Sequence, residues 1–243
     1  MFSPTRTARL TGAAYLGLAV TGMLGFLIVR PQLLNPDDPA ATVANIVANI
    51  ALAHFSVGLE LLVVITQALA ALGFYALFRG ERPIAAYAVA TFGMVNAAAI
   101  LVSAAALSTA VSIATTPTLA PGGDAAATVG VLYTLSDALW LAGGLFFGLW
   151  LIPMGWFMIS TKRMPHVLGI FLIAGGIGYL LSTVLTASFE GMPSSITDAL
   201  VIPATVGELW TVGYLLISGI RPAPGSGDPR SATAVPTTVR AQP

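Results

Sequence analysis

Six long apolar segments follow one another along the chain, separated by short polar stretches. Each is close to the roughly 20 residues that an α-helix needs to cross the hydrocarbon core of a bilayer. We therefore predict an all-α, polytopic membrane protein, a compact bundle of about six transmembrane helices joined by short loops. The predicted spans lie near residues 9–29, 54–78, 84–108, 135–159, 166–187 and 199–219.

The stretches between the spans carry helix-start signals. Asp38 followed by Pro39 is typical of a helix N-terminus, because aspartate caps free N–H groups and proline fits the first turn. Asp124 precedes the fourth span in the same way. We therefore predict outer helical extensions near residues 39–53 and 125–134.

The chain is predicted to form one transmembrane domain at residues 9–220. Residues 1–8 precede it, and residues 221–243, rich in Pro, Ala, Ser and Thr, are predicted to be a disordered tail. The first apolar run is longer than the roughly 7–15 residues of a signal-peptide core. Because Arg30 and Pro31 end this run without a clear cleavage site, we interpret it as an uncleaved span.

Composition explains why lipid must surround this chain. Only 8% of the 243 residues are charged, and 56% are hydrophobic. A soluble domain has roughly 25% charged residues, because its surface faces water. The chain has no cysteine, which excludes disulfides, thiolate metal sites and cysteine nucleophiles.

The basic residues predict how the bundle is oriented. Of the ten Lys and Arg residues, Arg30 alone falls on one side of the predicted bundle. The other nine are Arg6, Arg9, Arg79, Arg82, Lys162, Arg163, Arg221, Arg230 and Arg240. Since short cytoplasmic loops carry an excess of basic residues, we predict that both termini, including the tail, are cytoplasmic.

Three carboxyl side chains fall within the predicted spans: Glu60, Asp137 and Glu208. A charged group at the bilayer centre costs roughly 2.5–3.5 kcal/mol on insertion scales, so each of these acids is a candidate for function. Glu208 lies thirteen residues before Arg221, a depth of about 20 Å along a helix. It is the acid placed most clearly within the hydrocarbon core.

Uncharged polar residues accompany these acids. Gln67 shares a helix face with Glu60, and Asn96 gives the third span a polar side. The candidate intramembrane polar site therefore comprises Glu208, Glu60, Asp137, Asn96 and Gln67. No Lys or Arg lies inside a predicted span, so we expect the acids to have no cationic partner from the protein. Either they are protonated and hydrogen-bonded to neighbouring helices, or they face a wet cavity that opens outward.

Catalytic motifs are not found in the chain. The sequence contains no His-Glu-x-x-His pair, no Walker loop and no dinucleotide-binding glycine pattern after a strand. We therefore predict no catalytic, cofactor-binding or metal-binding residues. The glycine-rich stretches inside the spans, such as Gly144 with Gly148, favour close contact between helices.

A longer pattern suggests a family. The relevant residues are Phe146-Phe147-Gly148-Leu149, Gly155, Ser160, Pro165, Leu168-Gly169, Gly175, Gly178-Tyr179-Leu180, Pro203, Gly207-Glu208-Leu209 and Gly219-Ile220. With the Asp-Pro segment before the second span, they resemble the uncharacterised bacterial family catalogued as domain of unknown function 4386, over most of residues 6–221. The resemblance implies a six-span protein of the bacterial inner membrane and implies no activity.

Three hypotheses about function remain at this point. The first is a non-enzymatic membrane protein that binds a small ligand, lipid or ion in an outward-facing polar pocket. The alternative is a structural or regulatory partner of another membrane protein, or a homo-oligomer. An intramembrane enzyme is the least favoured, since no nucleophile or metal set is recognisable. The lipid bilayer is the expected surrounding partner, and no nucleic acid is expected.

The orientation leads to a direct test. Two reporters can be fused after Pro243, one that works in the cytoplasm and one that works only after export. We expect activity from the first alone, because the basic turns keep this side of the bundle in the cytoplasm. The measurement compares a cytoplasmic reporter with one that works only after export. Activity of the exported reporter would contradict the predicted topology.

Overall fold

The computed structural model describes residues 3–222, and these residues form helices with no β-strand among them. Six helical stretches within this range are long and apolar enough to cross a membrane. The predicted all-α bundle of about six transmembrane helices is therefore confirmed. Apart from its first two residues, the predicted disordered tail lies outside the described residues.

The first membrane segment combines three pieces, and the other elements follow in simple order. The helices are α1 (Pro4–Met23), a π-helical turn (Leu24–Val29), α2 (Arg30–Leu33), α3 (Pro39–Ala48), α4 (Ile50–Phe78), α5 (Pro83–Thr115), two 3₁₀ turns (Pro117–Leu119 and Pro121–Gly123), α6 (Ala125–Thr161), α7 (His166–Ser188) and α8 (Ser194–Ile217). The first span thus runs from Pro4 to Leu33 and is longer than the sequence predicted.

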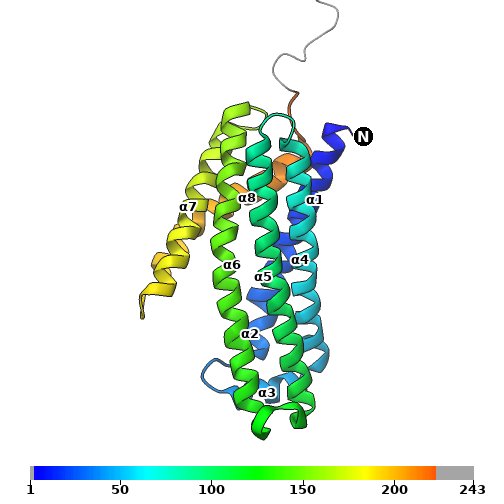
Figure 1. Ribbon diagram of the computed structural model, residues 1–243, viewed down its shortest axis with the longest axis vertical. Coiled ribbons are helices and arrows are strands. Elements are labelled where there is room, and N and C mark those ends of the chain that lie inside the picture. Colours follow the sequence, from blue (N-terminus) through cyan, green and yellow to red (C-terminus); the bar gives the residue numbers. More distant parts are fainter. Residues whose placement is uncertain (1–2, 223–243) are drawn as a thin grey trace, which may run out of the picture.

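The six long helices form a ring. Each of α4, α5, α6, α7 and α8 packs against the helix before it in the ring, and α8 returns to α1. In Figure 1, α4, α5 and α6 run side by side, whereas α7 diverges from α6 and α8 crosses obliquely behind them. The chain order therefore sets the neighbours, because short turns force successive helices to pack antiparallel.

The two ends of the bundle differ in charge. The end that holds the start of α1 and the α4–α5 and α6–α7 turns is called the basic end here, and it lies at the top of Figure 1. Arg79, Arg82, Lys162 and Arg163 belong to these two turns. The opposite end, called the far end, holds α3 and the connection between α5 and α6. Which end faces the cytoplasm stays a prediction.

The far end has a small core of its own. At 1.5 Å per residue the 37 residues of α6 span about 55 Å, which exceeds the roughly 30 Å of hydrocarbon. The long helices therefore continue beyond that thickness, and α3 packs against α4, α5 and α6 there. Asp38 caps α3 by accepting the N–H of Ala41, and Asp124 caps α6 through the N–H of Ala127.

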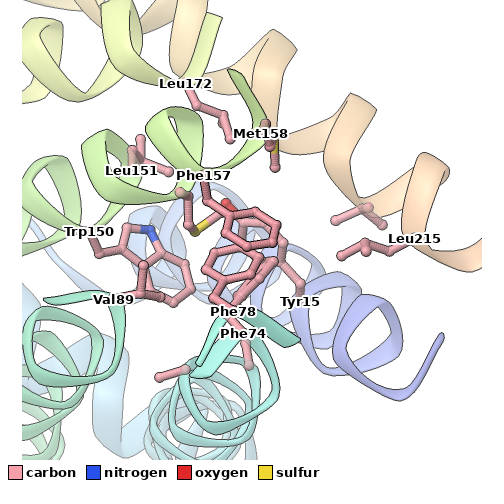
Figure 2. Packing of buried hydrophobic residues seen from close by; sticks show 14 of the residues in the cluster. Tyr15, Phe74, Phe78, Val89, Trp150, Leu151, Phe157, Met158, Leu172 and Leu215 are labelled. Carbon is pink, nitrogen blue, oxygen red and sulfur yellow. The ribbon is translucent and has the colours of Figure 1, made fainter. Parts of the chain in front are cut away.

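Toward the basic end, large aromatic side chains fill the middle of the ring. Figure 2 shows the rings of Phe78 and Phe157 lying face to face, with Trp150 beside them, and the two phenyl centroids are 3.7 Å apart. Tyr15 packs edge-on against both Phe74 and Trp150. These side chains join α1, α4 and α6 into one buried cluster.

Glycines set the spacing between α6, α7 and α8. Gly155 and Gly169 face each other so closely that a Cβ on either would meet the other's carbonyl oxygen. A Cβ on Gly178 of α7 would meet the carbonyl oxygen of Leu200 on α8. Small residues allow such backbone contact in lipid, where packing rather than the hydrophobic effect holds helices together.

The contact at Gly178 leads to a prediction about stability. The substitution Gly178→Ala is expected to destabilise the protein by about 1–3 kcal/mol, because the added methyl group forces α7 away from α8. Thermal unfolding in detergent measures this effect. The control Gly213→Ala, where a Cβ meets nothing within 4 Å, should be neutral or mildly stabilising. Equal behaviour of the two variants would contradict the role given to this contact.

Candidate functional site

A π-helical turn directs Arg30 into the bundle. The N–H of Arg30 donates to the carbonyl oxygen of Gly25, five residues earlier, instead of four. In an ordinary α-helix these two residues would lie roughly 140° apart around the axis. The wider turn brings them close to the same face, since an i to i+5 bond stacks them one above the other. Both residues consequently line the same small cavity.

Arg30 is the centre of a buried charge cluster. Its side chain is only 7% exposed, and one guanidinium nitrogen lies 2.6 Å from a carboxylate oxygen of Asp137. The other terminal nitrogen donates to the hydroxyl of Ser136 at 3.0 Å and lies 3.9 Å from Glu60. The expectation that the membrane acids have no cationic partner is therefore wrong for Asp137 and Glu60. Arg30 ends the predicted first span, whereas the helical segment continues to Leu33 and buries the Arg30 side chain.

One carboxylate oxygen of Glu60 accepts a hydrogen bond, and the other has no hydrogen-bond partner among the described residues. The indole N–H of Trp140 donates to Oε1 of Glu60 at 3.0 Å. The other oxygen, Oε2, is buried and has no hydrogen-bond partner among the described residues. Glu60 lines a cavity of about 10 Å³ together with Arg30 and Ser56, which is room for roughly one water molecule.

The cluster lies near the far boundary of the hydrocarbon. Glu60 precedes Arg79 by nineteen residues, or about 28 Å of helix, which is close to the thickness of the hydrocarbon core. The side chain of Asp137 is half exposed, at 50%, while those of Arg30 and Glu60 are buried. Water or headgroups can therefore reach Asp137 from one side, and the other two charges are enclosed by helices.

Glu208 lies in a different environment. The hydroxyl of Tyr15 donates to Oε1 of Glu208 at 2.5 Å, which connects α8 to α1. Glu208 also lines a partly open cavity of about 360 Å³ in the interior of the ring. The remaining lining residues, drawn from all six long helices, are Tyr15, Leu18, Ala19, Gly22, Met23, Val63, Asn96, Trp140, Gly144, Phe147, Tyr179, Thr205, Leu209 and Val212.

The five candidate residues do not share one cavity. Glu208 and Asn96 line the larger cavity, and Glu60 lines the smaller one. Asp137 lines neither of the two and reaches Arg30 from the side. Gln67 also lines neither; it is fully buried, and its side-chain amide has no hydrogen-bond partner among the described residues.

Two important residues were not predicted from the sequence. Arg30 holds Asp137 and Glu60, and Trp140 lines both cavities while donating to Glu60. The sequence did contain an indication of this role for Arg30. It is a single arginine at the end of one apolar run, and two acids, Glu60 and Asp137, lie at a similar depth in other spans. Pairing is the usual fate of such intramembrane charges.

Comparison with known proteins assigns a family and no activity. The family described as "Domain of unknown function (DUF4386)" matches residues 10–219 of the chain. No curated protein and no solved structure matches the chain.

The charge cluster leads to a prediction about stability. Arg30→Met is expected to destabilise the protein by about 3 kcal/mol, because removing one member of a buried ion pair leaves uncompensated charge. Adding Glu60→Gln and Asp137→Asn to this variant should restore much of the loss, since no unpaired charge then remains. Denaturation in mixed micelles measures both. A triple variant no more stable than the single one would contradict the electrostatic explanation.

Proposed function

We propose that this chain, a member of the DUF4386 family, binds a small organic cation. Because the function of the family is unknown, the proposal rests on the chain's own site. The ligand occupies the larger cavity, with its ammonium group at Glu208 and its apolar part against the helices. The observation that carries this proposal is the carboxyl group of Glu208, which lines a mostly apolar cavity of about 360 Å³ and meets no basic side chain there.

The three membrane acids differ in how their charge is balanced. Asp137 and Glu60 both lie within ion-pair distance of Arg30. No Lys, Arg or His is among the residues that line the cavity at Glu208. An unpaired carboxylate at this depth is unfavourable, so a cation brought by a ligand would be bound there with a gain that a neutral compound cannot obtain.

The walls of the cavity suit an organic cation more than a bare metal ion. Four aromatic side chains line it, namely Tyr15, Trp140, Phe147 and Tyr179. The faces of such rings attract ammonium groups, by roughly 0.5–2 kcal/mol each according to how dry the site is. A volume of about 360 Å³ lies within the range of small-molecule sites.

The alternative function, a structural partner of another membrane protein, has less support. It would use the rows of small residues on the helices. Gly155, Gly169 and Gly178 already face backbone of neighbouring helices within the chain. These positions are therefore not available as a contact surface for a second protein.

The proposal leads to a test with two matched compounds. Benzyltrimethylammonium is expected to bind the purified protein, and its uncharged carbon isostere neopentylbenzene is expected to bind at least about tenfold more weakly, a difference of about 1.4 kcal/mol. Glu208→Gln should remove this preference, because the amide keeps an acceptor for Tyr15 but loses the charge. Titration calorimetry in detergent measures both compounds.

The control for this test is an acid on the same helix. Asp198→Asn removes an exposed carboxylate near the start of α8, outside the cavity, and should leave binding unchanged. Equal affinity for the two compounds would contradict the proposal, and so would undiminished binding of the cation by the Glu208→Gln variant.

A further inference from the structure

We infer that the basic end carries a second binding site, which holds the headgroup phosphate of an anionic phospholipid between Lys162, His166 and Arg221. These three side chains line a surface cavity of about 340 Å³, together with Ile159 and Met164. This site is distant in the fold from the cavity at Glu208, and the inference does not depend on the proposed function.

The lining of this cavity is complementary to an anion. It contains three basic residue types and no acid. Among residues 3–222, neither Lys162 nor Arg221 takes part in an ion pair. The neighbouring Arg163, in contrast, pairs with Glu81. Arg163 is therefore neutralised within the chain, whereas Lys162 of the same turn and Arg221 after α8 line the cavity.

Local backbone structure holds these residues in place. Lys162 has a φ of 56°, the left-handed conformation, and is the one non-glycine residue with positive φ in the described part of the chain. Such a conformation is uncommon for a residue with a side chain and often marks a functional position. It ends α6 and turns the chain toward α7, with Lys162 at the rim of the cavity.

Arg221 is held against the same turn by two hydrogen bonds. Its backbone N–H donates to the carbonyl oxygen of Arg163 at 3.1 Å, and Nε of Arg163 donates to the carbonyl oxygen of Arg221. Because Arg163 is also tied to Glu81, the segment after α8 is fixed to both basic turns. The side chain of Arg221 is thereby positioned beside Lys162 from a distant part of the sequence.

The start of α7 adds to the positive potential. Pro165 occupies the N-cap position, and no side chain caps the first N–H groups of this 23-residue helix. His166 is the first helical residue and lines the cavity. Uncapped N–H groups at a helix start attract anions, so the helix reinforces the three basic side chains.

The position of the site favours a lipid over a soluble anion. Ile159 and Met164 form its apolar part, and the exposed side chains of Val167 and Ile170 follow directly on α7. A phosphate bound at the turn would therefore place its acyl chains along an apolar, lipid-facing helix. Basic pockets at the ends of membrane helices are known to bind anionic headgroups in this way.

Thermal unfolding in detergent with added lipid tests the inference. Phosphatidylglycerol is expected to raise the melting temperature of the full chain more than phosphatidylcholine does, because a lipid that binds only the folded state stabilises it. In the double variant Lys162→Gln with Arg221→Gln, the difference between the two lipids should fall to about half or less. Arg79→Gln, a substitution at the same end but outside the cavity, should keep the full difference.

Two further arms distinguish the alternatives. Inorganic phosphate should produce no comparable shift, and a shift equal to that of phosphatidylglycerol would replace the lipid with a soluble anion and overturn the inference. Lys162→Gly should raise the melting temperature without lipid, since glycine adopts positive φ freely, and should still weaken the response to phosphatidylglycerol. A full lipid response in either the Gly variant or the double variant would contradict the site.

Discussion

A hydrocarbon solvent offers no hydrogen-bond partners, so a polar group inside the bilayer that the protein does not satisfy costs free energy. Arg30 illustrates this constraint. Its guanidinium meets Asp137, the hydroxyl of Ser136 and the backbone carbonyl of Tyr133, and it also lies over the rings of Phe26 and Tyr133. These partners are on α6 and in the π-helical turn after α1, and Glu60 adds α4. The charge of one residue therefore fixes the position of three membrane segments at the far end.

Trp140 connects this charge cluster to the larger cavity. Its indole N–H is held by Glu60, and its ring forms part of the wall that Glu208 also lines. The two polar regions of the membrane domain are thus separate in space but share one side chain.

Helix packing explains why the larger cavity can exist beside a dense core. Near the basic end, Trp150 and the stacked rings of Phe78 and Phe157 fill the ring of helices. On the α7 side, Gly155 and Gly178 bring backbones into contact at particular points, while α7 as a whole diverges from α6 in Figure 1. The larger cavity lies beside this packing and is lined by side chains from all six long helices.

The sequence by itself determined the six apolar helices and the placement of basic residues at their ends, because span length and hydrophobicity are local properties of the chain. It also predicted that Glu208 is the most deeply placed acid. Only the tertiary structure decided which charges meet. Arg30 reaches Glu60 and Asp137 through a π-helical turn at Gly25, and a change of helical register by one residue is not encoded in apolar periodicity. The partners of a buried charge lie on distant segments, so they are settled only when the ring of helices closes.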